Sequence, residues 1–377
     1  MKTVCSPDVC AGCRLCEAKC PVSAVRVTET LDSVFAEIDT AACIGCGLCE
    51  SLCPVLDPPP KTEPAVWYEG WASDPDLRAA SSSGGIAAAL TRAFIRSGGY
   101  VCSCRLEKGR FVFAVTNGEE EARRFAGSKY VKSDMTGVYG AVEELLSRGE
   151  KVLFIGLPCQ SAALRKAIPE KSRDNLVRVD LICHGTPTRP LLKQYLAEQG
   201  TDLDSLSFLS FRDKHHMGLS CERDADARLT DRYTIAFLNA LDYTDGCYRC
   251  RYASTDRVSD LTLGDNWGTE RPEDLSKGLS LILCQTEKGR ALLDASELAL
   301  RPVNAEKAAA RNAQLTAPSR LPPERRPFFD RLGRGRSFNR LVFRLYPKRC
   351  LKQIAKKWAL RSGLYALKSK KGTDEKA

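Results

Sequence analysis

Two runs of cysteine in the first sixty residues have the spacing that iron-sulfur chemistry requires. The runs "CAGCRLCEAKCP" and "CIGCGLCESLCP" both read Cys-x-x-Cys-x-x-Cys-x-x-x-Cys-Pro. In paired runs of this kind, three cysteines bind one 4Fe-4S cluster and the fourth binds the other cluster. We therefore expect two clusters. The first would be held by Cys10, Cys13, Cys16 and Cys53, and the second by Cys43, Cys46, Cys49 and Cys20.

Zinc is the alternative occupant, because zinc sites also use Cys-x-x-Cys pairs. A zinc site takes four ligands around one ion, however, and interleaved triplets suit that geometry poorly. Over its whole length the segment is similar to bacterial dicluster ferredoxins, which relay single electrons. Cys5 lies outside the pattern, and we expect an ordinary thiol there.

Four of the remaining cysteines share a context that suggests a third 4Fe-4S cluster. Cys159 follows the strand-like "KVLFI", and Cys183 ends "LVRVDLI", so two neighbouring strand ends would direct their thiols to one place. Ligands usually bind at this edge of a parallel sheet. Cys247 and Cys250, in "GCYRCRYA", complete a set of four. The alternative is that the first two are small buried apolar side chains and that the later pair binds nothing.

Apolar strand-like runs alternate with amphipathic helical runs around these residues. "GGIAAALTRAFIRSGG" precedes "YVCSC", "GVYGAVEELLSRG" precedes "KVLFIG", and "SAALRKAI" precedes "LVRVDLIC". This alternation predicts β/α units and a largely parallel sheet.

Composition limits the class of protein. Eighteen cysteines in a chain without a secretory h-region or a long apolar run predict a cytoplasmic protein whose thiols are free for metals. The net charge of +10 is uneven: residues 1–60 hold four Lys/Arg and eight Asp/Glu, whereas residues 320–377 hold eighteen and four. Because nothing except charge supports a nucleic-acid partner, we expect none.

Between about Trp67 and about Asn312 the sequence contains, in order, the motifs "SSSGGIAAAL", "FAGSKYVKSD", "GLPCQSAALRK", "DLICHGTP", "FRDK", "GCYRCRYA" and "SDLTLGDNWG". In these motifs it resembles the family of coenzyme F-420 hydrogenase and dehydrogenase beta subunits. The resemblance implies FAD beside a 4Fe-4S cluster, with Cys159, Cys183, Cys247 and Cys250 as the cluster ligands. The expected fold class is α+β or α/β, a small ferredoxin-like dicluster domain followed by an α/β flavin-binding domain of that family's type.

Proline-rich stretches mark the expected domain boundaries, because proline interrupts helices and central strands. They are "DPPPKTEP" and "APSRLPPERRP". The predicted parts are a dicluster 4Fe-4S ferredoxin domain at 1–57, a proline-rich linker at 58–66, an FAD and 4Fe-4S binding domain at 67–318, and a basic tail at 319–377.

The family resemblance also implies flavin contacts. Glycines and hydroxyls at the start of a helix let backbone N–H groups approach a ligand closely, although an ordinary serine N-cap explains the same residues. In the family, the loop that opens "SSSGGIAAALTRAF" and the "GSKY" loop both contact the flavin. Lys129 would place a positive charge near the flavin's pyrimidine end. Lys129 is thus the one candidate for a catalytic, flavin-tuning role; a solvated surface lysine is the alternative. The implied cofactor-binding residues are Ser83, Gly84, Gly85, Ser128 and Lys129.

Two further motifs stay open. "LTLGDNWG" presents Asp265, Asn266 and Trp267 in a loop that either closes over a cofactor or simply packs. His184 lies beside a proposed ligand and would tune its cluster, whereas "KHH" at 214–216 is typical of a solvated loop.

Three functions fit these observations. The first is an enzyme, an iron-sulfur flavoprotein reductase that passes electrons from ferredoxin or another low-potential donor through 4Fe-4S clusters to FAD and an organic substrate. Its family-level analogy points to cell-surface polysaccharide synthesis. The second is a ferredoxin:coenzyme F-420 (deazaflavin) oxidoreductase. The third is a non-catalytic electron-transfer subunit of a larger complex.

The tail combines Arg and Lys with Phe, Leu, Tyr and Trp at near-helical spacing, from "RGRSFNRLVF" to "ALKSKK". This composition predicts an interfacial amphipathic helix and peripheral contact with the inner face of the membrane. The alternative is a solvated basic helix that folds back on the acidic N-terminal domain.

Overall fold

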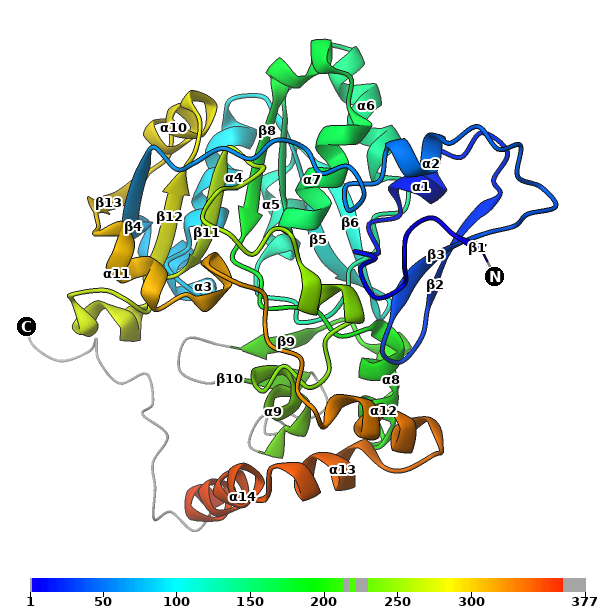
Figure 1. Cartoon of the computed structure of the whole chain (residues 1–377). Coiled ribbons are helices and arrows are strands. Elements are labelled where there is room, and N and C mark those ends of the chain that lie inside the picture. The colour runs from blue at the N-terminus through cyan, green and yellow to red at the C-terminus, as the bar shows by residue number, and fades with distance from the viewer. Residues whose placement is uncertain (1, 213–216, 222–229, 362–377) are drawn as a thin grey trace, which may run out of the picture.

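The computed structural model describes residues 2–212, 217–221 and 230–361. A small N-terminal sheet lies on one side of the molecule, and an eight-stranded sheet with its helices forms the main body (Figure 1). A two-stranded ribbon of β9 (Leu209–Arg212) and β10 (Met217–Cys221) lies near the C-terminal helices. The histidines of "KHH" and the end of the tail lie outside the described residues.

The N-terminal domain is a three-stranded antiparallel sheet with two one-turn helices. Its strands are β1 (Lys2–Thr3), β3 (Val34–Ile38) and β2 (Val25–Glu29), in that order. Alternate residues of β2 and β3 are apolar and buried, as expected of strands with one face on a core. The short helices α1 (Leu15–Ala18) and α2 (Leu48–Ser51) each carry the third cysteine of a run.

The large sheet is mixed, which corrects the expectation of a largely parallel sheet. Its central strands β5, β7, β8 and β11 are parallel, but the outer strands pair antiparallel. Lys108 and Gly109, both with positive φ, join β5 directly to β6, and a two-residue turn forces an antiparallel partner. The strand order is β13 (Leu298–Pro302), β4 (Val66–Ala72), β12 (Ser280–Cys284), β11 (Leu261–Asp265), β8 (Leu176–Leu181), β7 (Val152–Gly156), β5 (Tyr100–Glu107), β6 (Arg110–Thr116).

Helices cover both faces of this sheet because its central strands are apolar on both faces. In β7, Val152 and Phe154 pack with α6 (Val138–Ser147) and α7 (Pro158–Ala167). Leu153 and Ile155 point to the opposite face and pack with α4 (Ile86–Arg96) and α10 (Glu287–Asp294). Three shorter helices, α3 (Pro75–Ala80), α5 (Glu119–Ala122) and α11 (Ala305–Ala310), lie in the connections.

A separate aromatic core includes the first part of the predicted tail. Tyr195, Tyr233, Phe328 and Phe338 are buried together between α8 (Arg189–Ala197), α9 (Arg232–Leu238), α12 (Arg325–Gly333) and α13 (Phe338–Leu345). The last helix is α14 (Pro347–Arg361). The tail is therefore several helices, and no helix in the described ranges is long and apolar enough to cross a membrane. The domain boundaries stay predictions; β4 begins at the end of the expected linker.

Candidate iron-sulfur sites

The first predicted cysteine group lines a cavity in the N-terminal domain. Cys10, Cys13 and Cys16 border this cavity together with Cys53, so the fold brings the last cysteine of the second run to the first. All four side chains are buried. Gly12 has a φ of +62° and lies so close to Val34 that a side chain would clash, which lets the loop wrap tightly. Four sulfurs around one cavity fit a 4Fe-4S cubane, in which each thiolate binds a different iron.

Cys5 borders the same cavity, which corrects the expectation of an ordinary thiol. Its side chain is buried and forms hydrogen bonds with Cys10 and Cys53. These hydrogen bonds lower the pKa of Cys10 to about 7 and the pKa of Cys53 to about 6. The thiolate is the form that binds a metal. Sequence spacing gives no sign of this contact, because it depends on how β1 lies against β3.

The second predicted group lies at the surface of the same domain. Cys20, Cys43 and Cys49 are partly buried, whereas Cys46 is exposed. The backbone N–H of Ala24 donates to the Cys20 sulfur at 3.2 Å. In the ranges that the structure describes, no three His, Cys, Asp or Glu side chains are close enough to share a single metal ion.

The third predicted group forms at the ends of two neighbouring strands. Cys159 lies in the first turn of α7, directly after β7, and Cys183 follows β8, the parallel neighbour of β7. Cys247 and Cys250 approach from the turn at Asp245–Arg249. Cys159 and Cys250 pack against one small apolar cluster, and the Cys247 sulfur lies 3.9 Å from the hydroxyl of Thr186, three residues after Cys183. Burial first, and then the charges of the other three thiols, raise the pKa of Cys183. This grouping fits the four thiolate ligands of a cubane.

Three donors from the main body hold the loops of the first group. The Lys132 ammonium donates to the carbonyl of Ala11 at 3.1 Å, and the Tyr139 hydroxyl donates to the carbonyl of Cys13 at 2.5 Å. The Tyr252 hydroxyl donates to the carbonyl of Pro54 at 2.6 Å. Each of these carbonyls belongs to a cysteine of the first group or to its neighbour in sequence.

The same three donors lie beside the third group. Burial would lower the pKa of Lys132, but the thiolate charges of Cys247, Cys159 and Cys183 raise it above its ordinary value. Burial and the charge of Cys159 also raise the pKa of Tyr139 and Tyr252. One lysine and two tyrosines thus bond to the loops of the first group and also interact with cysteines of the third.

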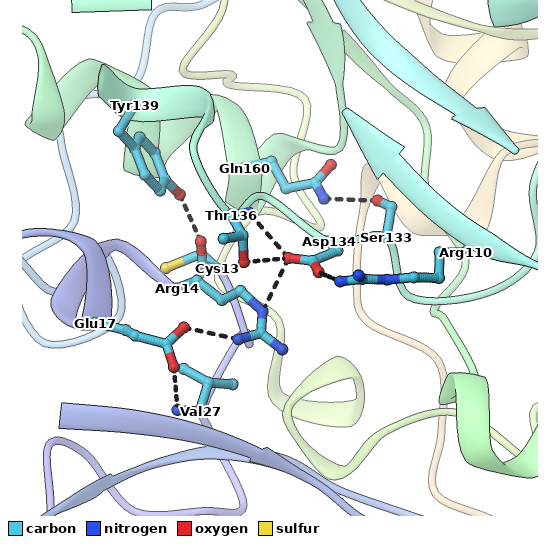
Figure 2. Close-up of polar contacts among 10 residues, drawn as sticks. All are labelled: Cys13, Arg14, Glu17, Val27, Arg110, Ser133, Asp134, Thr136, Tyr139 and Gln160. Atoms are coloured by element: carbon cyan, nitrogen blue, oxygen red, sulfur yellow. Dashed lines mark hydrogen bonds and ion pairs between the residues drawn. The ribbon is translucent and has the colours of Figure 1, made fainter. Parts of the chain in front are cut away.

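An ion-pair network fixes the N-terminal domain against the main body (Figure 2). Arg14 donates to Glu17 at 2.7 Å and pairs with Asp134 at 3.2 Å across the domain boundary. Asp134 also accepts from Arg110 at 2.8 Å. At Gly246 the two parts are so close that a side chain there would meet the carbonyl of Cys10. These contacts give the two parts a defined relative position.

The residues expected to contact a flavin are placed mainly by contacts within the chain. The Ser83 hydroxyl donates to the carbonyl of Leu279 at 3.1 Å, and the N–H of Gly84 donates to Ser280 at 3.0 Å. Gly85 starts α4 with a φ of +85°. Their flavin role stays a prediction.

The second expected flavin loop is tied to the first. The N–H of Ser128 donates to the Ser82 hydroxyl at 3.0 Å. The Lys129 ammonium donates to the carbonyls of Phe125 and Ala126, and burial lowers the pKa of Lys129 to about 8.

Sequence reasoning missed a polar group beside these loops. Arg212, in the quoted "FRDK", forms a two-pronged ion pair with Asp265 at 2.7 and 3.1 Å and donates to the carbonyl of Ser82 at 2.6 Å. Its Nε is buried and has no hydrogen-bond partner in the described part of the chain. The negative charge of Asp265 also acts on His184, the neighbour of Cys183, where it opposes the lowering of the His184 pKa by burial. The motif signalled importance, but only the fold shows that Arg212 meets "LTLGDNWG".

Comparisons with known proteins bear on both parts of the chain. Residues 9–57, which contain the eight cysteines of the two runs, match the 4Fe-4S dicluster domain. This match decides the zinc alternative in favour of iron-sulfur clusters. Residues 149–306 match the C terminus of the coenzyme F420 hydrogenase/dehydrogenase beta subunit. That range includes the third cysteine group and Arg212, and excludes the expected flavin loops.

A similar curated protein is a subunit of the F(420)H(2) dehydrogenase of Methanosarcina mazei, 27% identical over 187 residues. The match covers 47% of this chain and 53% of the relative, so the chain spans about half the length of the curated relative it matches. Among solved structures, a chain of the F420-reducing [NiFe] hydrogenase complex from Methanosarcina barkeri has a TM-score of 0.48 at 18% identity. That match covers 81% of this chain and 94% of the solved chain.

Proposed function

We propose that the chain relays electrons through three cysteine-held clusters. The premise is that residues 149–306 match the C terminus of the coenzyme F420 hydrogenase/dehydrogenase beta subunit and that residues 9–57 match a 4Fe-4S dicluster domain. The family assignment agrees with the resemblance predicted from the motifs. When bound, 4Fe-4S clusters exchange single electrons. The protein side of the proposal concerns how the chain orders and separates the three sites.

One observation carries the proposal. Lys132, Tyr139 and Tyr252 each hold a backbone carbonyl of the first cysteine group and each lie within charge reach of the third group. Two groups of cysteines with unrelated structural roles would not be expected to share the same three polar side chains. The shared side chains support the first and third groups as neighbouring stations of one path.

Exposure supports the order of the stations. The loop of the second group is open to solvent, with Ile44 64% exposed and Cys46 exposed, whereas the first group is buried against the main body. A partner protein therefore meets the second group first. We propose that electrons pass between this partner and the third group by way of the first group. A ferredoxin is one low-potential donor of the required kind.

FAD is the proposed redox group beyond the third cysteine group. When bound, FAD would couple the single electrons of the clusters to hydride chemistry. Arg212, with its unsatisfied Nε, would offer a polar contact to such a group. Ser83 and Lys129 already bond within the chain, and this observation favours the alternative of an electron-transfer subunit without its own flavin chemistry.

The organic substrate remains open. The name of the relative from Methanosarcina mazei makes coenzyme F420 a candidate hydride partner, as in the second predicted function. A role in polysaccharide synthesis stays a prediction, because no observation of the fold supports it. The whole relative's activity is a proposal for this chain, because only about half of its length matches.

Iron and sulfide analysis of the anaerobically purified chain tests the relay. We expect roughly twelve iron and twelve sulfide per chain, three clusters of four. Cys159→Ser should remove about four of each and leave the electron paramagnetic resonance signals of the two N-terminal clusters unchanged. Cys284→Ser is the control, because Cys284 is a buried cysteine that lies outside every motif.

The outcomes separate the alternatives. Eight iron per chain in the native protein would reject the third cluster. Retention of twelve iron by Cys159→Ser would reject Cys159 as a ligand. Flavin analysis of the same preparations distinguishes the flavoprotein from the subunit without flavin, because the latter holds twelve iron and binds no FAD.

A further inference from the structure

The last described helix presents two faces that the protein core does not use. On α14, Leu351, Ile354 and Trp358 are 53%, 41% and 66% exposed. Their spacing of three and four residues places them in one stripe along the helix. Three large apolar side chains in one exposed stripe are costly to leave in water, which indicates that another surface covers them.

A neighbouring side of α14, next to Leu351 and Ile354 on the helix surface, attaches the helix to the protein. Cys350 is 1% exposed and belongs to the aromatic core around α13. Gln353 donates to the backbone carbonyl of Asp231 at 3.0 Å. These contacts fix which face of α14 points outward, so the exposed stripe is not a consequence of a free helix. Figure 1 places α14 at an edge of the molecule, away from the large sheet.

A basic row starts beside Leu351, the first residue of the apolar stripe, and continues along the polar side of the helix. Lys348, Lys352 and Lys356 are exposed and follow one another at intervals of four residues. The sequence of α14, "PKRCLKQIAKKWALR", contains no Asp or Glu. The covering surface must therefore be apolar at its centre and negatively charged around it. A bilayer with anionic headgroups has this arrangement, and Trp is a residue that favours the headgroup region.

We propose that α14 lies in the surface of an anionic lipid bilayer, with Leu351, Ile354 and Trp358 inserted among the acyl chains and the lysine row against the headgroups. The attachment of α14 through Cys350 and Gln353 would orient the whole chain on that surface. The proposal is independent of the electron relay, since it uses no residue of the cysteine groups.

Co-sedimentation of the full chain with vesicles tests the proposal. We expect binding to 3:1 phosphatidylcholine:phosphatidylglycerol vesicles, weak binding to phosphatidylcholine alone, and weaker binding at high salt. Leu351→Ser/Ile354→Ser/Trp358→Ser should reduce the partition coefficient about tenfold or more. Lys352→Gln/Lys356→Gln should reduce it by about fivefold for each charge removed.

A matched control and a depth measurement complete the design. Leu56→Ser/Leu321→Ser removes two exposed apolar side chains elsewhere, 46% and 59% exposed, and should leave vesicle binding unchanged. Brominated lipids should quench the fluorescence of the native chain more than that of Trp358→Phe. Unchanged binding of the triple variant, or no binding by the native chain, would overturn the proposal. Concentration-dependent dimers that the triple variant abolishes, without vesicle binding, would instead assign the stripe to a second copy.

Discussion

Removal of the Lys132 charge is expected to lower the reduction potential of the third cluster. Its ammonium interacts with three of the four thiols of the third group, and a reduced cluster carries one more negative charge than an oxidised one. At a separation of about 8 Å and an effective dielectric constant of about 20, a unit charge contributes about 2 kcal/mol. For one electron this corresponds to about 90 mV, since a tenfold change in equilibrium is 59 mV. Lys132→Met should therefore shift the midpoint downward by several tens of millivolts to about 90 mV.

Potentiometric titration followed by electron paramagnetic resonance measures this shift. The signals of the second group, which lies at the exposed side of the N-terminal domain, should not move. Lys132→Arg keeps the charge and should restore most of the potential. Lys288→Met is the matched control, because Lys288 also donates to two backbone carbonyls, those of Arg173 and Leu176. An unchanged midpoint with full iron content in Lys132→Met would refute the electrostatic reasoning.

Four further variants test other contacts. Ile44→Ser/Leu48→Ser should slow reduction by a protein donor roughly fivefold to tenfold and leave reduction by dithionite unchanged, because only docking needs these exposed side chains. Asp180→Ala leaves the buried Arg257 without its carboxylate partner and should lower the unfolding free energy by about 3 to 5 kcal/mol in denaturant titrations. Glu297→Ala removes an exposed partner of Arg92, which keeps its pair with Asp74, and should cost less than about 1 kcal/mol. Cys5→Ala removes hydrogen bonds to two thiols and should lower the midpoint of the first cluster without loss of iron.

The sequence predicts the central elements of the fold well, because their patterns are local. The runs "YVCSC", "KVLFIG" and "LVRVDLIC" become the parallel strands β5, β7 and β8, and the helical runs between them become helices. The antiparallel outer strands are not visible in such periodicity, since strand direction depends on which neighbour a strand finds. The β5–β6 turn at Lys108 and Gly109 is a short local signal that the β/α alternation hides.

In the candidate sites, the sequence predicts the groupings of cysteines that follow from their spacing along the chain. The exchange of Cys53 into the first group follows from the repeated motif, and the meeting of Cys159 and Cys183 follows from adjacent strand ends. Cys5 and Arg212 depend on contacts between distant segments, to β3 and to Asp265, which no local pattern records. Lys132 lies in a quoted motif, but its role depends on a domain boundary that only the folded chain creates.

The polar boundary between the two domains has a consequence for electron transfer. A ferredoxin module that moved freely would be joined to the main body by its linker alone. Here, in contrast, side chains of the main body donate hydrogen bonds to carbonyls at or beside Cys10, Cys13 and Cys53. Because these bonds act on the ligand-bearing loops themselves, they hold the cysteines of the first group more directly than contacts at the domain's outer surface would. The distance between the first and third groups is then fixed by the fold. In the proposed relay, motion of the N-terminal domain would therefore not be needed for the step between the first and third groups, and the exposed second group would be free to meet a partner.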